Sequence, residues 1–144
     1  MQFQNIRESI LIVDFGSQVT KLIARRIRDL GVFSEIVTPN KINSINNFDK
    51  FKGIILSGGP STVTKQKFQS IPKIIFSKNI PILGICYGLQ LIAKLFGGKI
   101  KSSKKRREFG RAIIFRKKKS LLLKNFFRSN QSVWMSHEDA VVKL

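Results

Sequence analysis

Residues 81–97, PILGICYGLQLIAKLFG, decide the fold. Residues 81–86 form a short apolar run of the length of a buried strand, and the apolar residues that follow have the spacing of one helix face, namely Leu89, Ile92, Ala93 and Phe96. Cys86 lies at the junction, with glycines two positions before and two positions after it. A sharp strand-to-helix turn that presents a nucleophile needs small residues at both positions. The stretch therefore predicts a nucleophile elbow at Cys86.

The same bend would place the thiol of Cys86 at the N-terminal end of the helix. Unpaired N–H groups and partial positive charge at that end favour a thiolate. The alternative is a structural cysteine inside a strand, which is the usual state of a free cysteine. The two correctly spaced glycines favour the nucleophile.

Upstream, short apolar runs alternate with a helical pattern. Strands are predicted at residues 9–14, 32–37 and 53–57, with a helix over residues 19–30 and a polar loop with a short helix at 39–52. A further helix is predicted at 66–77, with a kink at Pro72. After residue 98, strands are expected at 112–115 and 133–135. This order predicts an α/β fold, an open and mostly parallel sheet with flanking helices.

Two more glycine-bearing turns follow predicted strands. They are Asp14-Phe15-Gly16-Ser17-Gln18 and Ser57-Gly58-Gly59-Pro60. Glycines at a strand end let main-chain N–H groups approach an anionic centre, although a GGP sequence alone is also an ordinary turn. Because the ends of parallel strands meet along one edge of a sheet, we expect these turns to meet the Cys86 bend there.

His137, in the segment VWMSHED (residues 133–139), is the only histidine. From the residues alone it is the candidate base for Cys86. The alternative is a local turn or helix cap with hydrogen bonds from Ser136 and Asp139. A single histidine without a second set of ligands argues against a metal site.

Composition limits the class of protein. A chain of 144 residues fits one domain, and its single cysteine excludes an internal disulfide and suits a reducing compartment. Without a bilayer-length apolar run or a secretory signal, we expect a cytoplasmic protein with no membrane partner. The net charge of +19 fits either nucleic-acid binding or a solvated basic surface. The absence of a nucleic-acid motif favours the solvated surface.

Five segments in chain order resemble the class I glutamine amidotransferase family. They are residues 10–31, 53–60 (GIILSGGP), 84–90 (GICYGLQ), 107–110 (REFG) and 133–139. The resemblance implies a flavodoxin-like fold, incomplete at its C-terminus, in which residues 1–144 form a single truncated domain. It implies that Cys86 attacks the side-chain amide of L-glutamine and forms a thioester. It assigns the oxyanion hole to the N–H groups of Gly59 and Tyr87, and glutamine binding to Gly58, Gln90, Ser136, His137 and Asp139.

Within the family, FGSQ and WMSH are most similar to the member that makes GMP from xanthosine monophosphate (XMP) in purine biosynthesis. The resemblance implies that ammonia passes to XMP on a separate ATP pyrophosphatase (synthetase) domain or subunit. It implies no cofactor for the glutaminase domain, because ATP and Mg²⁺ belong to the synthetase domain.

The resemblance also corrects the assignment of His137. It places the histidine and glutamate of the catalytic triad in a His-Pro-Glu segment that would follow Leu144, so His137 becomes a pocket residue. Glu138 stands where the family has glycine, and its side chain would crowd the substrate. We therefore expect a weak or inactive glutaminase. The alternatives are a truncated pseudo-enzyme that binds glutamine or a partner, and a basic nucleic-acid-binding α/β module.

Overall fold

The computed structural model describes residues 8–64, 66–102, 108–118, 120–124, 130–137 and 139–143. Its contacts divide the chain into two compact units. Unit 1 consists of Met1–Lys101 with Val141–Leu144, and unit 2 consists of Ser102–Ala140.

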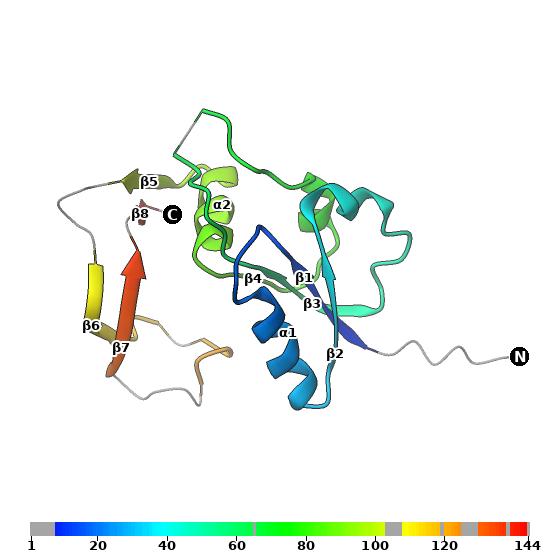
Figure 1. Cartoon of the computed structure of the whole chain (residues 1–144), viewed down its shortest axis with the longest axis horizontal. Helices are drawn as coiled ribbons and strands as arrows, with labels where there is room; N and C mark the ends of the chain where they lie inside the picture. Colours follow the sequence, from blue (N-terminus) through cyan, green and yellow to red (C-terminus); the bar gives the residue numbers. More distant parts are fainter. Residues whose placement is uncertain are drawn as a thin grey trace, which may run out of the picture. The chain divides into compact units, whose positions relative to one another are not determined.

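Unit 1 contains a parallel sheet of four strands in the order β2-β1-β3-β4 (Figure 1). The strands are β1 (Ser9–Val13), β2 (Phe33–Val37), β3 (Phe51–Leu56) and β4 (Ile82–Gly84). All three pairings between them are parallel, which confirms the predicted α/β class. From β1 the chain continues to β2 on one side of the sheet and then crosses back to β3 on the other side of β1, so the strand order reverses between β1 and β3. In open parallel sheets, ligands bind at the carboxyl ends of the strands beside such a point.

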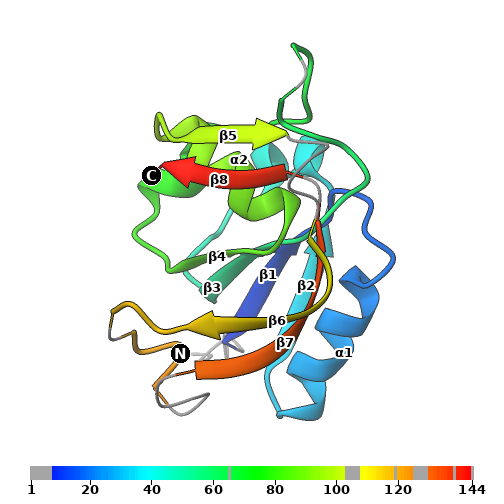
Figure 2. The same ribbon diagram turned by 90° about the vertical axis from the view of Figure 1, so that its left-hand side faces the viewer.

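Helices α1 (Thr20–Asp29) and α2 (Tyr87–Leu95) lie on opposite sides of this sheet (Figure 2). Successive residues of β1 face opposite sides, as the pleat of a strand requires. Leu11 and Val13 join the main apolar cluster with Leu91 of α2, while the fully buried Ile12 lies on the side that α1 covers. Both sides of the central strand are therefore apolar and buried.

The predicted helix at residues 66–77 was wrong. Only Lys73–Ser77 is helical, as the short 3-10 helix η2, and Pro72 before it is extended, with φ −59° and ψ 134°. A proline has no N–H to donate and disfavours helical geometry in the residue before it, so the helix cannot extend back through Ile71. The short helix expected within 39–52 is present as the 3-10 helix η1 (Pro39–Ser44).

The later part of the chain is built from two strand pairs. In unit 2, β6 (Glu108–Phe115) pairs antiparallel with β7 (Asn130–His137), so the strands predicted at 112–115 and 133–135 are confirmed and are longer than predicted. A second pair, β5 (Lys99–Ser102) with β8 (Asp139–Lys143), was not predicted.

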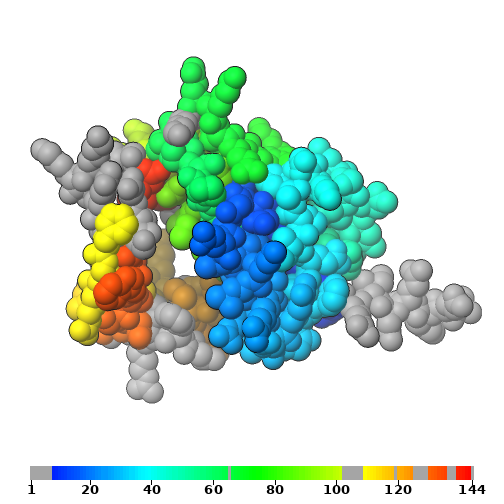
Figure 3. Space-filling view, in the orientation of Figure 1, coloured from blue at the N-terminus to red at the C-terminus, as the bar shows by residue number. Residues whose placement is uncertain are grey.

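The surface of α1 shows how part of the positive charge is carried. Lys21, Arg25, Arg26 and Arg28 are all exposed, and Figure 3 shows this helix in blue on one face of unit 1. Such a solvated basic face needs no bound partner. Among the described residues, no helix combines the length and the apolar character needed to cross a membrane.

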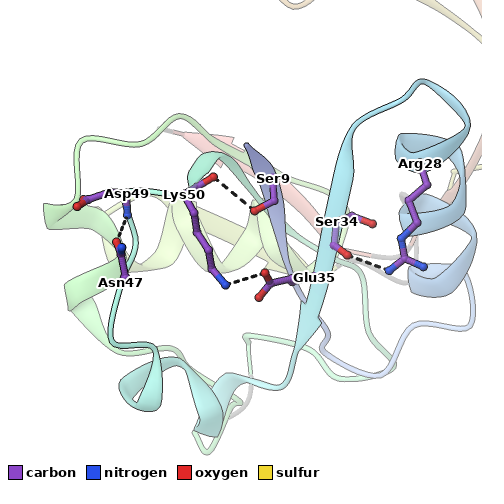
Figure 4. Close-up of polar contacts among 7 residues, drawn as sticks. All are labelled: Ser9, Arg28, Ser34, Glu35, Asn47, Asp49 and Lys50. Carbon is purple, nitrogen blue, oxygen red and sulfur yellow. Dashed lines mark hydrogen bonds and ion pairs between the residues drawn. The ribbon is translucent and has the colours of Figure 1, made fainter. Parts of the chain in front are cut away.

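Polar contacts connect β1, β2 and the loop before β3 (Figure 4). The Lys50 ammonium lies 2.7 Å from the Glu35 carboxylate, and the Ser9 hydroxyl donates to the Lys50 carbonyl at 3.4 Å. The Arg28 guanidinium donates to the Ser34 carbonyl at 2.8 Å, and the Asp49 N–H donates to the Asn47 side chain at 2.7 Å. These bonds stabilise the sheet without involving the glycine-bearing turns.

We expect Glu35→Gln to lower the free energy of unfolding by about 0.2–1 kcal/mol, the usual range for a solvent-accessible ion pair. Both side chains are about one third exposed, so salt weakens the pair. Urea unfolding at low and high salt checks this, and the difference from the wild type should shrink at high salt. The control is Glu8→Gln, because Glu8 and Lys52 form a longer and more exposed pair that should contribute almost nothing.

Candidate active site

Cys86 occupies a strained bend between β4 and α2. Its φ of 48° and ψ of −109° lie in a region that favours glycine, and its side chain is exposed. The bend makes Cys86 the residue that precedes the first turn of α2, where N–H groups have no acceptor within the helix. This is the geometry of a nucleophile elbow, as the sequence predicts.

The two flanking glycines are required by the packing of the main chain. A Cβ at Gly84 would lie 2.6 Å from the Leu89 nitrogen, and a Cβ at Gly88 would lie 2.2 Å from the Leu56 carbonyl oxygen. The Gly88 N–H donates to the Ser57 and Ile85 carbonyls at 3.1 and 2.9 Å. The helix that follows Cys86 is thus fixed directly against the end of β3.

The three predicted turns meet at this edge of the sheet. A Cβ at Gly58 would lie 3.6 Å from both the Cys86 Cβ and the Ser17 hydroxyl oxygen. A Cβ at Gly59 would lie only 2.5 Å from the Phe15 carbonyl oxygen. The side chain of Cys86 therefore faces the turn after β3 and not the apolar interior.

Two main-chain donors belong to this edge of the sheet. Within the described part of the chain, the N–H groups of Gly59 and Tyr87 have no hydrogen-bond acceptor. Gln90 lies one turn along α2, and its N–H donates to the Cys86 carbonyl at 3.1 Å. This edge of the sheet thus carries a thiol and main-chain donors, and donors of this kind can stabilise an oxyanion that forms when a thiol attacks a carbonyl.

Asp14 holds the turn after β1. Its carboxylate accepts hydrogen bonds from the Gly16 N–H at 2.9 Å and from the Thr20 hydroxyl at 2.8 Å. Thr20 is the first residue of α1 and is buried, so the bond couples the turn to the start of that helix. This carboxylate therefore has a structural role beside the site.

Tyr87 anchors the start of α2. Its ring packs against Phe15 at 5.0 Å between centroids, and its hydroxyl donates to the Gln69 carbonyl. Burial raises the pKa of the Tyr87 phenol above its usual value. The hydroxyl thus stays protonated and holds the 66–72 segment against the site.

We expect Tyr87→Phe to lower the free energy of unfolding by about 0.5–1.5 kcal/mol, the usual contribution of one hydrogen bond. A phenol whose pKa is higher in the folded state keeps its full contribution below the unfolded pKa of about 10 and loses it as pH rises through the folded pKa. The difference between wild type and variant should therefore narrow above pH 10. Denaturant unfolding between pH 7 and pH 11 checks this, and a constant difference would contradict it.

The remaining predicted residues belong to unit 2. Ser136 and His137 are the last residues of β7, and Asp139 is the first of β8. Glu138, whose side chain was expected to crowd the substrate, lies outside the described residues. The roles of these residues stay predictions. Among the described residues, no group of three or more His, Cys, Asp or Glu side chains is placed to hold a metal ion.

Ser57 is a residue of this edge to which the sequence assigned no role. It is fully buried, accepts a hydrogen bond from the Phe15 N–H at 3.2 Å and donates to the Gly58 carbonyl at 2.9 Å. A polar residue at the end of an apolar strand, directly before two glycines, is the signal that could have identified it.

Comparison with known proteins identifies the family. Residues 11–144 match the glutamine amidotransferase class-I family. The chain belongs to this family. It is similar to the GMP synthase of Treponema denticola, with 49% identity over 142 residues, covering 99% of the chain and 27% of that protein. The GMP synthase of Agrobacterium fabrum is 49% identical over 141 residues, covering 95% of the chain and 26% of that protein. The chain spans about a quarter of the length of these class I amidotransferase relatives.

Solved structures agree with the class I amidotransferase fold. A protein from Thermoplasma acidophilum, described as a candidate GMP synthase subunit, superposes with a TM-score of 0.77 at 35% identity, covering 93% of the chain and 66% of that protein. A glutamine amidotransferase from Thermotoga maritima superposes with a TM-score of 0.68 at 18% identity, covering 93% of the chain and 62% of that protein. The predicted flavodoxin-like arrangement of the sheet is thereby confirmed.

Proposed function

We propose that this chain is the glutaminase part of a GMP synthase. Family membership and the similarity to two GMP synthases support the proposal. The observation that carries it is the exposed Cys86 on a strained bend, with its side chain against the Gly58 turn.

In the proposed reaction the Cys86 thiolate attacks the side-chain carbonyl carbon of L-glutamine. A C–S bond forms, and the carbonyl oxygen becomes an oxyanion that the N–H groups of Gly59 and Tyr87 stabilise. The C–N bond then breaks, and the nitrogen takes a proton and leaves as ammonia. Water hydrolyses the thioester, which releases glutamate and regenerates the thiol. One well-aimed oxyanion donor contributes about 2.7–4 kcal/mol to such a step.

The rest of the proposed site binds glutamine and delivers ammonia. Gly58, Gln90, Ser136, His137 and Asp139 would hold the substrate. The ammonia would react with ATP-activated XMP on an ATP pyrophosphatase domain or subunit, where ATP and Mg²⁺ bind. Similarity to the Thermoplasma acidophilum protein, itself described as one part of a GMP synthase, supports an arrangement with a synthetase partner.

A glutamine-like chloroketone tests this proposal. We expect it to modify Cys86, as read by mass spectrometry, and we expect L-glutamine but not L-glutamate at the same concentration to slow the modification. Cys86→Ala is the control for reaction elsewhere on the chain. Modification at the same rate with and without L-glutamine would show that no glutamine site exists and would end the proposal.

We also expect the 144-residue polypeptide to release ammonia from glutamine only weakly. Its single histidine, His137, is assigned to substrate binding, and a helix N-terminus alone stabilises an anion by only about 0.3–1 kcal/mol. A missing general base lowers a rate by about 10²–10⁴-fold. A coupled ammonia assay on the purified polypeptide, with Cys86→Ala as background, measures this. Turnover above about 1 s⁻¹, the lower end for typical enzymes, would contradict it.

A further inference from the structure

The Ser57 hydroxyl connects two of the turns at the candidate active site. It lies fully buried at the carboxyl end of β3, between the turn after β1 and the Gly58–Gly59 turn. It accepts from the Phe15 N–H at 3.2 Å and donates its proton to the Gly58 carbonyl oxygen at 2.9 Å. Because a hydroxyl has one proton to donate, that proton is committed to the Gly58 carbonyl.

The Gly58 carbonyl and the Gly59 N–H belong to the same peptide unit. In a trans peptide these groups point in opposite directions across a rigid plane, and the described chain has no cis peptide bond. Holding the carbonyl oxygen on Ser57 therefore fixes the direction of the Gly59 N–H. A hydrogen bond to the carbonyl also polarises the amide and strengthens its N–H as a donor.

Side chains contribute little to this restraint. Neither Gly58 nor Gly59 has a Cβ, and glycine resists rotation of its neighbouring peptides less than any other residue. A Cβ at Gly59 would lie against the Phe15 carbonyl, so the close packing of the two turns excludes a stiffer residue there. A hydrogen bond at the Gly58 carbonyl is therefore a direct restraint on the orientation of the donor.

We propose that Ser57 is a positioning residue for the oxyanion hole, which holds the Gly58–Gly59 peptide with its N–H directed at the developing oxyanion. This inference rests on the proposed glutaminase function. Ser57 acts through Gly59 and does not touch the substrate.

The test compares two reagents on the complete chain. A glutamine-like chloroketone first adds the Cys86 sulfur to its ketone carbon, which forms a C–S bond and an oxyanion. The sulfur then displaces chloride from the neighbouring methylene carbon, and the first C–S bond breaks as the ketone re-forms. Iodoacetamide reacts by direct displacement of iodide and creates no oxyanion. We expect Ser57→Ala to slow the chloroketone reaction about 10- to 100-fold, below the 10²–10³-fold loss for deletion of a donor, because the N–H remains but is misdirected. The iodoacetamide rate should stay within about twofold.

A matched pair separates the hydroxyl from packing. Ser57→Thr and Ser57→Val add nearly the same volume, but only the threonine keeps a hydroxyl. The Ser57→Thr variant should therefore react with the chloroketone at least about tenfold faster than the Ser57→Val variant. This pair decides the question if Ser57→Ala does not fold. Equal losses with both reagents, or equal chloroketone rates for the pair, would overturn the positioning role. A wild-type reaction that L-glutamine does not slow would instead overturn the proposed function, and the positioning role with it.

Discussion

Replacement of Cys86 by glycine is expected to abolish the chloroketone reaction and at the same time to raise the free energy of unfolding. The reaction is lost because the sulfur is removed. Stability rises because Cys86 is held at φ 48° and ψ −109°, where a Cβ is strained by about 1–3 kcal/mol. Glycine removes the strain but adds about 0.5–1 kcal/mol of unfolded-state entropy, which leaves a net gain of about 1 kcal/mol. Urea unfolding and mass spectrometry measure the two effects.

Cys86→Ala is the matched control for this result. It removes the sulfur as Cys86→Gly does, but it keeps the Cβ and therefore the strain. The two variants should be equally unreactive, and only the glycine variant should be more stable than the wild type. A glycine variant no more stable than the alanine variant would show that the bend stores no strain.

Gly88→Ala is expected to have the largest effect on folding of any single methyl added at this site. The new Cβ would lie 2.2 Å from the Leu56 carbonyl oxygen and 2.7 Å from the Leu56 carbonyl carbon. These are main-chain atoms of β3, which cannot rotate away as a side chain can. We therefore expect Gly88→Ala to lower the free energy of unfolding by more than about 3 kcal/mol, beyond the usual cost of overpacking a core. Denaturant unfolding followed by circular dichroism measures it.

Gly58→Ala provides the comparison, since the nearest atoms to its new Cβ would be at the ordinary contact distance of 3.6 Å. Its stability should change by no more than about 0.5 kcal/mol. If Gly88→Ala and Gly58→Ala have the same free energy of unfolding, the close contacts at Gly88 do not determine stability.

Local pattern was enough to predict the parallel sheet. Three of its strands, β1, β3 and β4, are mostly apolar runs, and glycine or proline lies close to their ends, as at Ser57-Gly58-Gly59-Pro60. The strand β2 carries Ser34 and Glu35 between its apolar residues. The same logic failed at 66–77, where the apolar spacing fits a helix but Pro72 prevents one. The pairing of β5 with β8 was missed because it joins segments far apart in the chain, which no local periodicity records.

The candidate site also contains features that the sequence predicts and features that it does not. The bend at Cys86 could be predicted because its steric requirement is written in two glycines at fixed spacing. The contact of Ser57 with Phe15 could not, because it joins residues 42 positions apart through a turn geometry that the residue types do not specify. The roles of Ser136, His137 and Asp139 stay predictions from the family resemblance.

The attachment of α2 to β3 has a mechanical consequence. The peptide after Tyr87 bonds to the Ser57 carbonyl, and the Gly59 donor follows that same residue by two positions. Any displacement of the end of β3 would therefore be passed on both to the start of α2, which follows Cys86, and to the turn that begins at Gly58. A load applied to this one strand would thus be felt on both flanks of Cys86.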